Sequence, residues 1–528
     1  MDRGIPNPCY TCRNRRIQCD QSGVPCGKCQ KAGLECLDKR PFKWVKGVAI
    51  RGKLQGHSYE NAISSSAIAK DKSAGPPNPK RALVRASVRR DRRVDTLGII
   101  SESSSSSSSP GPSLVIQDPA FSSLDKTSKY YIDYYNERIC ELFIVYDTER
   151  NPFRSLIPLG LEDPVLMKAL LALAARHHVN KGQSFYETES TTSPQLVTAN
   201  RHALAFKHQA MEALSKSLAD PKLSKQDTTV ASIFLLVFLD LLESGSDGWN
   251  FHLEGAKNLI ASTYPQNDSQ TGINHGPGQT VQEIRDFITK QIKVIETLGA
   301  TFLRPKLLSY FPPFEQQGLQ LQESIEKSFV GCPEYLLSVM QLLSMQRDSM
   351  SELDQLDQTA TESHIKETTS LLEMTQNFDC YAWASGLQQS HTPSPSEIIS
   401  LCSLSRSYKL GASIYGRRIL DAMTGEKTVL DDTVAELLGL IDSLQSDRLL
   451  FKCVLWPICI AGLECQWQPQ REFLIACAER FWDITNCLNA VNAAKILQEY
   501  WRQVDASGQA QSRWIFDIGR LGRDWLLI

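Results

Sequence analysis

The chain has 528 residues, a length typical of roughly two to four domains, and its 42% hydrophobic and 22% charged residues are sufficient for a large buried core. Its formal net charge of −2 is the sum of the charges of two unlike parts. Residues 1–100 contain 21 Lys and Arg against 8 Asp and Glu, a net charge of +13, and the rest of the chain has a net charge of −15. A basic head followed by an acidic body indicates a polyanionic partner for the head.

The apolar segments are too short for a membrane protein. No apolar run of signal-peptide length stands at the N-terminus, so secretion is not expected. The longest apolar stretch, Ala231–Leu239, ends at Asp240, and a second one is interrupted by Pro457. Both fall short of the roughly 18–20 residues that span a bilayer, so we expect a soluble, intracellular protein without a membrane partner.

Three regions follow one another along the chain. Residues 1–45 are dense in Cys, Lys and Arg. Residues 46–113 contain several prolines, a basic run and the tract Ser103–Ser109, a composition typical of a disordered linker. In residues 114–528 the apolar residues recur at helical spacing. The expected fold class is therefore mostly α, with a small cysteine-rich domain, a linker and a large all-helical domain.

Six cysteines in the first 36 residues form two matching C-x2-C-x6-C units. A C-x2-C pair places two thiolates around one metal ion, and a closed structural zinc site needs four ligands. Two zinc ions need eight coordination positions, which six sulfurs supply if two of them are shared. The predicted ligands of two zinc ions are Cys9, Cys12, Cys19, Cys26, Cys29 and Cys36.

Alternative roles of the six cysteines have less support. A disulfide framework belongs to secreted proteins, and thiol exchange does not need two matched triplets. A zinc module that only supports folding or binds protein, and a thiol redox or metal sensor, stay as alternatives. A cluster of six thiolates and two Zn²⁺ would carry a charge of about −2, which the surrounding basic residues can offset. These are Arg13, Arg15, Arg16, Lys28 and Lys31.

The segment Pro8–Leu37 resembles the DNA-binding domain of fungal binuclear zinc cluster transcription factors of the galactose-regulator type. The resemblance rests on the cysteine spacing, on the basic segment Cys12–Asp20 and on Gly33–Cys36. It implies that Cys9 and Cys26 bridge the two zinc ions. It also implies that the short helix after the second cysteine enters the DNA major groove and reads a CGG-type triplet.

The same resemblance implies which side chains contact DNA. Arg16 stands where the family usually has a base-reading Lys, and its guanidinium could bind guanine O6 and N7. Gln18 replaces the Lys or Arg that often precedes the third cysteine. The basic flank after the cluster either follows the phosphate backbone, as in the family, or is a solvated linker. The predicted DNA-binding residues are Arg13, Arg15, Arg16, Gln18, Lys39, Arg40 and Lys43.

A second basic run lies further along the linker. It fits a nuclear import signal, and nonspecific DNA contact or a plain charged linker are the alternatives. The residues of this import candidate are Lys80, Arg81, Arg89, Arg90, Arg92 and Arg93. Many members of the family dimerise through a coiled coil after the cluster, but residues 47–100 show no sustained apolar heptad. A monomer and a homodimer held through the C-terminal body both remain open.

The body is predicted to be helical from its apolar periodicity. Asp163 followed by Pro164 is typical of an N-cap and the first helical position. Further helices are expected over Thr228–Leu242, Val281–Ile295, Ile398–Leu420, Thr433–Leu444 and Arg471–Tyr500. Segments such as Asn151–Arg154 and Ala461–Glu464 resemble the fungal-specific transcription factor domain, and its subgroup that regulates drug sensitivity and secondary metabolism.

No motif in the body indicates catalysis. Sequences of the types GxxxxGK[ST], GxGxxG, HExxH and GxSxG are absent. His177 and His178 are adjacent and do not share a helix face, so a metal pair is not expected. Nine further cysteines lie among apolar residues and are expected to be buried thiols of the core. They are Cys140, Cys332, Cys380, Cys402, Cys453, Cys459, Cys465, Cys477 and Cys487.

These observations predict a nuclear, zinc-dependent regulator of RNA polymerase II transcription that reads CGG-like triplets in double-stranded DNA. The acidic body would recruit the transcription machinery or co-regulators, and the chain would not be an enzyme. The alternatives are a helical enzyme or scaffold carrying a DNA-anchoring zinc module, or a thiol redox or metal sensor.

Overall fold

The computed structural model describes residues 8–20, 25–34, 36, 119–188, 193–246, 248–263, 279–305, 308, 323–350, 358–389, 392–507, 514–518 and 524–528. The chain divides into two units, Met1–Ser109 and Pro110–Ile528. The predicted linker, residues 46–113, lies outside the described residues, and so does the interval 47–100, for which no coiled coil is expected.

The described residues of the first unit form two short helices, α1 (Tyr10–Asn14) and α2 (Gly27–Lys31). A cysteine precedes each helix as its N-cap, and its Sγ accepts a hydrogen bond from the backbone N–H three residues later. Each helix then carries the second cysteine of a C-x2-C pair on its buried side. The two halves are therefore structural repeats, as their matching sequences are.

The second unit is built from helices, and no strand occurs in its described residues beyond two isolated bridges. Its first half surrounds α10, which is apolar on all sides and packs against α8, α11 and α12. The first half contains α4 (Pro119–Ser123), α5 (Lys126–Tyr134), the π-helix η1 (Tyr135–Ile139), α6 (Cys140–Leu142), α7 (Pro152–Glu162), α8 (Pro164–Lys181), α9 (Pro194–Ala219), the 3-10 turn η2 (Leu223–Lys225), α10 (Asp227–Glu243), α11 (Trp249–Thr263) and α12 (Gln279–Ala300).

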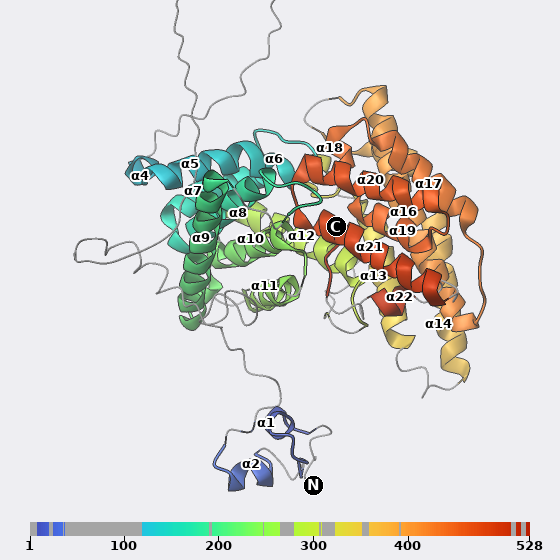
Figure 1. Ribbon diagram of the computed structural model, residues 1–528, viewed down its shortest axis with the longest axis horizontal. Helices are drawn as coiled ribbons and strands as arrows, with labels where there is room; N and C mark the ends of the chain where they lie inside the picture. The colour runs from blue at the N-terminus through green and yellow to red at the C-terminus, as the bar shows by residue number, and fades with distance from the viewer. Residues whose placement is uncertain are drawn as a thin grey trace, which may run out of the picture. The chain divides into compact units, whose positions relative to one another are not determined.

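The second half surrounds α16, a 30-residue helix that packs against α13, α14, α15, α17 and α19. Figure 1 shows the two halves side by side in the body, with α12 and α13 between them. The second half contains η3 (Ile325–Lys327), α13 (Glu334–Ser349), α14 (Gln358–Asn377), α15 (Cys380–Gly386), α16 (Pro395–Thr424), α17 (Asp431–Leu444), α18 (Arg448–Phe451), α19 (Leu455–Glu464), α20 (Gln468–Thr485), α21 (Leu488–Ser507) and α22 (Trp514–Asp517).

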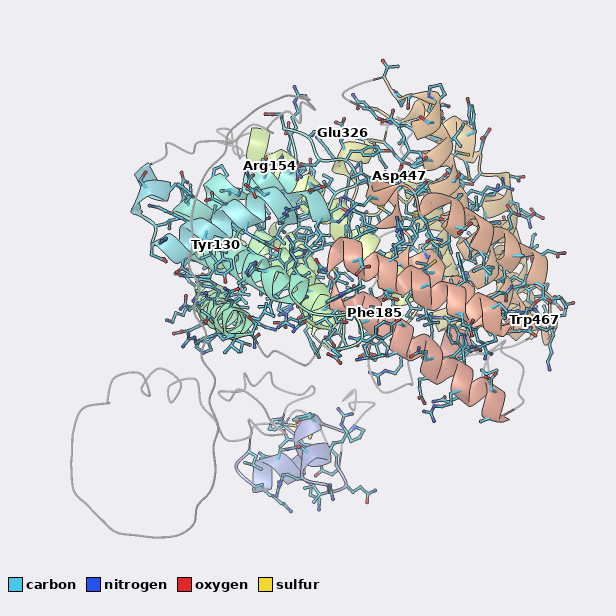
Figure 2. The ribbon with its side chains drawn as sticks, turned by 45° about the horizontal axis from the view of Figure 1, so that its top comes forward. Tyr130, Arg154, Phe185, Glu326, Asp447 and Trp467 are labelled. Atoms are coloured by element: carbon cyan, nitrogen blue, oxygen red, sulfur yellow. The ribbon has the colours of Figure 1, made fainter. Side chains whose placement is uncertain are left out.

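One continuous core joins the two halves. Side chains fill the space between the ribbons of the body (Figure 2). Trp456 of α19 is fully buried, and its indole N–H donates to the hydroxyl of Thr301 at the end of α12 over 2.9 Å. The absence of a side chain at Gly411 permits this packing, because a Cβ there would lie 2.4 Å from the Trp456 ring.

Local sequence signals set several helix ends. Asp163 caps α8 by accepting hydrogen bonds from the N–H groups of Val165 and Leu166, and Pro164 is the first helical residue, as predicted. Ser394 and Glu397 form a capping box at the start of α16. The helices expected around residues 228–242, 281–295, 398–420 and 433–444 are confirmed with slightly longer bounds.

The single helix predicted over Arg471–Tyr500 is wrong. The structure has two helices there, because Asn486 adopts the left-handed conformation with φ 48° and ends α20. Asparagine tolerates this conformation better than most residues do. The chain changes direction after Asn486, and the next helix, α21, begins at Leu488. The side-chain amide of Asn180 in α8 donates to the carbonyl oxygens of Leu242 and Asn486 over 2.7 and 2.9 Å, which fixes this corner against the first half.

The body cysteines agree with the prediction of buried thiols in eight of nine cases, since Cys402 is only half-buried. No helix among the described residues is long and apolar enough to cross a membrane.

Candidate metal centre and nucleic-acid interface

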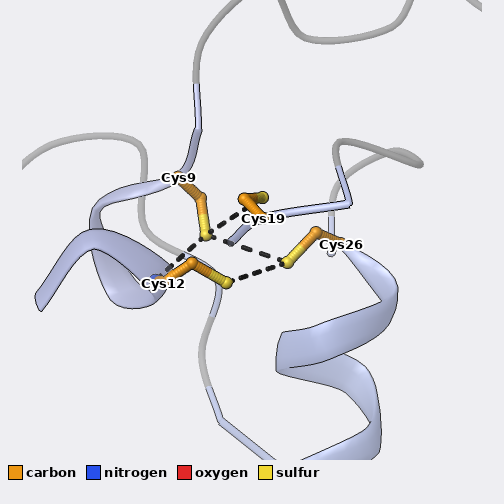
Figure 3. A group of neighbouring side chains, drawn as sticks. All are labelled: Cys9, Cys12, Cys19 and Cys26. Carbon is orange, nitrogen blue, oxygen red and sulfur yellow. Dashed lines mark hydrogen bonds between the residues drawn. The ribbon is translucent and has the colours of Figure 1, made fainter. Parts of the chain in front are cut away.

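The six cysteines of the first unit come together in space. Two groups of four sulfur atoms form, and within each group all sulfurs lie within 4.8 Å of one another. One group consists of Cys9, Cys12, Cys19 and Cys26, and Figure 3 shows their sulfurs pointing toward one centre. The other group consists of Cys9, Cys26, Cys29 and Cys36. No further group of this kind occurs in the described part of the chain.

The two groups share Cys9 and Cys26, whose sulfurs are 3.8 Å apart. Four sulfurs around one point are the donor set that structural zinc prefers, and two shared sulfurs complete two such sets from six residues. The geometry therefore fits two zinc ions. The Cys12 Sγ lies 3.6 Å from that of Cys26, close to the separation of about 3.8 Å between two sulfur ligands of one tetrahedral zinc ion.

The shared cysteines are also the N-caps of the two helices. The Sγ of Cys9 accepts the N–H of Cys12, and the Sγ of Cys26 accepts the N–H of Cys29, both over 3.4 Å. These backbone hydrogen bonds lower the pKa of both thiols. The N-terminus of a helix favours negative charge, so the fold places the two shared thiolates where the backbone stabilises them.

An acidic side chain connects the two repeats. The carboxylate of Asp20, just after the third cysteine, accepts the N–H of Gly27 at the start of α2 over 3.0 Å. Glu35, the residue before the sixth cysteine, lies outside the described residues. Asp20 is not among the predicted site residues, although an acidic residue facing a helix N-terminus is a recognisable capping signal.

The surface of the cluster is basic. Five cationic side chains are exposed, and none of them pairs with a carboxylate among the residues described here. They are Arg13, Arg15, Arg16, Lys28 and Lys31. Three of the four DNA-contact candidates in the described part lie in this set, and the fourth, Gln18, is also exposed. The structure thus presents these candidates on one short segment that starts in α1.

Arg16 has an unusual backbone. The N–H of Ile17 donates to the carbonyl of Cys12 and that of Arg16 to the carbonyl of Arg13, over 3.1 and 3.0 Å. This is the hydrogen-bond pattern of a Schellman motif, which ends a helix with one left-handed residue. That residue is Arg16, with φ 54°.

The second repeat ends in the same way with a glycine. The N–H of Leu34 donates to the carbonyl of Cys29, and Gly33 has φ 62°. The two repeats are offset by 17 residues, so Cys26 corresponds to Cys9 and Gly33 corresponds to Arg16. A non-glycine residue in this conformation is strained, and such strain is often retained at functional sites. A 17-residue self-comparison of the sequence would have revealed this pair.

The remaining site predictions fall outside the described residues. They are the phosphate-contact candidates Lys39, Arg40 and Lys43, and the import candidates Lys80, Arg81, Arg89, Arg90, Arg92 and Arg93.

The helical fold and the cysteine centre together define the class of protein to which the chain belongs. Residues 7–44 match the fungal Zn(2)-Cys(6) binuclear cluster domain, and residues 130–528 match the fungal specific transcription factor domain. The chain belongs to the family with a fungal specific transcription factor domain, and its N-terminal cluster domain takes two zinc ions. This combination is that of zinc cluster, DNA-binding regulators of transcription.

Two proteins of Neurospora crassa are similar to the chain. Acriflavine sensitivity control protein acr-2 is 24% identical over 411 residues, which cover 75% of this chain and 65% of that protein. Transcriptional regulatory protein pro1 is 43% identical over 51 residues, which cover 10% of this chain and 7% of that protein. The chain thus spans less than two thirds of the length of these relatives. No solved structure matches it significantly.

Proposed function

We propose that this chain regulates RNA polymerase II transcription by reading a CGG-like triplet in double-stranded DNA with its zinc cluster domain. The observation that supports the proposal most is the shared sulfur geometry beneath an exposed basic segment. A metal-held scaffold of this size has little core of its own, so zinc supplies the folding free energy that positions the basic residues.

The proposed ligand assignment follows the two sulfur groups. Cys9 and Cys26 bridge the zinc ions, and each metal is completed by two further cysteines. Cys12 and Cys19 complete one site, whereas Cys29 and Cys36 complete the other.

The proposed reading face is the C-terminal end of α1 and the turn after it. The guanidinium of Arg16 can donate two hydrogen bonds to guanine O6 and N7, the commonest specific contact in the major groove. Arg13, Arg15 and Gln18 are exposed on the same segment and provide neighbouring base or phosphate contacts. Because the left-handed conformation redirects the chain at Arg16, it separates the helix from the segment that returns to Cys19.

The basic flank and the linker contribute functions that do not depend on the DNA sequence. Lys39, Arg40 and Lys43 hold the phosphate backbone through salt-dependent contacts. The basic run from Lys80 to Arg93 directs the chain to the nucleus. The acidic body contacts co-regulators or the transcription machinery and acts by binding, without catalysis.

The similarity to a protein named for acriflavine sensitivity supports a pathway-specific role in drug response, with secondary metabolism as the other candidate pathway. A homodimer would be held through the helical body.

Fluorescence anisotropy with a labelled CGG duplex tests the DNA proposal. The zinc-loaded chain should bind this duplex more tightly than a scrambled one. Arg16→Ala should remove most of this preference, because a bidentate base contact contributes about 1–3 kcal/mol of discrimination. Lys31→Ala, which removes the same charge from the second repeat, should weaken binding to both duplexes equally. Equal loss of preference in both variants would contradict the assignment of the reading face.

A further inference from the structure

The helical body contains a cavity of about 500 Å³ between its two halves. It is lined by the segment around η1 and α6, the C-terminal end of α8, the turn at α18 and the C-terminal end of α20. Its volume is in the range of small-molecule sites, which is about 300–1,000 Å³. Residues that are far apart in sequence, from 138 to 486, thus meet around one space.

The lining of this cavity is unusually cationic for an acidic domain. Four of its side chains are Arg138, Lys181, Arg448 and Lys452, against only two carboxylates, Glu141 and Asp483. None of the four cations forms an ion pair within the part of the chain that the structure describes. Elsewhere in the body basic side chains commonly pair with carboxylates, as Arg154 does with Asp147 and Arg471 does with Asp505.

Lys452 is the deepest of the four cations. It is 9% exposed, and its ammonium group donates to the backbone carbonyl of Glu141 over 2.7 Å. Burial lowers its pKa, and the opposing effects of Cys453 and of the carboxylates of Glu141, Asp147 and Asp447 offset this only in part. A buried ammonium group with one neutral acceptor is costly unless an opposite charge compensates it. An anion in the cavity would supply that charge.

The other polar groups of the lining refine the ligand chemistry. The Oε1 of Gln183 is buried and accepts no hydrogen bond from any described residue, so it can accept one from a ligand hydroxyl. His177 is not a candidate ligand contact, because its Nδ1 already pairs with the Tyr134 hydroxyl over 2.8 Å and burial lowers its pKa to about 4. The neutral imidazole therefore forms part of the wall.

We propose that this cavity binds a small organic polyanion, a hydroxylated di- or tricarboxylate or a sugar phosphate, as an effector of the regulatory body. Lys452 would hold the anion at the base of the cavity, and the exposed side chains of Arg138, Lys181 and Arg448 would hold it at the rim. The contacts would come from both halves of the body. Binding would thus stabilise one arrangement of α8 relative to α18 and α20, which is the means by which a ligand shifts a conformational equilibrium. This inference does not depend on DNA reading.

Isothermal titration calorimetry of the full zinc-loaded chain tests the proposal with citrate, fructose 1,6-bisphosphate and the uncharged ester triethyl citrate. At least one of the two anions should bind saturably at one site, whereas the ester should not. The anion that binds identifies the carboxylate or the phosphate source. The double variant Arg138→Gln/Arg448→Gln should weaken binding at least about tenfold, since hydrogen bonds to charged groups contribute strongly.

The controls separate ligand binding from folding. Both arginines are exposed, so their replacement should leave the circular dichroism and melting temperature of the free chain unchanged. Lys427→Ala removes an exposed cation that does not line the cavity and should leave anion binding unchanged. Absence of saturable binding by either anion, or equal affinities in the wild type and the double variant, would overturn the proposal.

Discussion

The paired turns at Arg16 and Gly33 allow the strain of the reading segment to be measured. Both residues end a short helix in the left-handed conformation, with φ 54° and 62°. For a residue with a Cβ this conformation costs roughly 1–2 kcal/mol, part of which returns through the smaller entropy of its unfolded chain compared with that of glycine. Arg16→Gly should therefore stabilise the cluster by about 0.5–1 kcal/mol, and Gly33→Ala should destabilise it by about 1 kcal/mol.

The Gly33 substitution is a clean measure of backbone strain, because a Cβ at this position would meet no atom within 4 Å. Since metal binding and folding are coupled in a small zinc domain, the strain should appear in the zinc affinity. The assay is competition for zinc between the full chain and a chelator. Arg16→Gly should resist zinc loss about two- to fivefold better than the wild type, and Gly33→Ala should resist about fivefold less well.

The two substitutions should affect DNA sequence preference differently from zinc affinity. Arg16→Gly should lose the preference for the CGG duplex although it binds zinc more tightly than the wild type. Gly33→Ala should keep that preference when zinc is saturating. Easier zinc release from Arg16→Gly than from the wild type would refute backbone strain at Arg16, and full sequence preference in this variant would refute its role in base reading.

Three further predictions concern the body and the flank. Glu464→Gln should lower the free energy of unfolding by about 2 kcal/mol in chemical denaturation, because it removes the charge that accepts two hydrogen bonds from the buried guanidinium of Arg418, which then keeps only Asp421 as an ionic partner. Arg502→Gln, in an exposed pair, should leave the free energy of unfolding almost unchanged. Burial lowers the pKa of His177 to about 4 from 6.5, so the folded state binds fewer protons in this interval and stability rises with pH across it. Between pH 6.5 and about pH 5 the wild type should lose about 1.5 kcal/mol more stability than His177→Gln, and parallel pH curves would argue against a neutral buried imidazole. Lys39→Ala should reduce the slope of log affinity for DNA against log salt by about 0.9 without changing sequence preference, and an unchanged slope would exclude a phosphate contact.

The cysteine centre could be predicted from sequence because its information is local. Two residues between cysteines place both thiols of a pair at the start of one helix, and the count of six sulfurs for two metals requires sharing. The structure brings the same sulfurs together in two groups that share Cys9 and Cys26. The strain at Arg16 was not predicted, because the arginine itself gives no sign of it and only an alignment of the two repeats places Arg16 at the position of Gly33.

The helices of the body were predictable where a cap and a periodic apolar face coincide, as at Asp163. The break at Asn486 was missed because the apolar period continues across it, and only the backbone conformation ends the helix. The cationic cavity was beyond sequence reasoning for another reason. Its lining comes from four segments whose proximity depends on the packing of the two halves, and each lysine or arginine alone is typical of a solvated surface.

The most direct test of the central claim is selection of bound sequences from random double-stranded DNA by the full chain, with zinc content measured on the same sample. The wild-type chain should contain two zinc ions and enrich a CGG-like triplet, and Cys9→Ser should lose both, whereas Arg16→Ala should keep the zinc and lose the enrichment. Enrichment that survives in Cys9→Ser, or a zinc-loaded wild-type chain that enriches no sequence, would contradict the central claim.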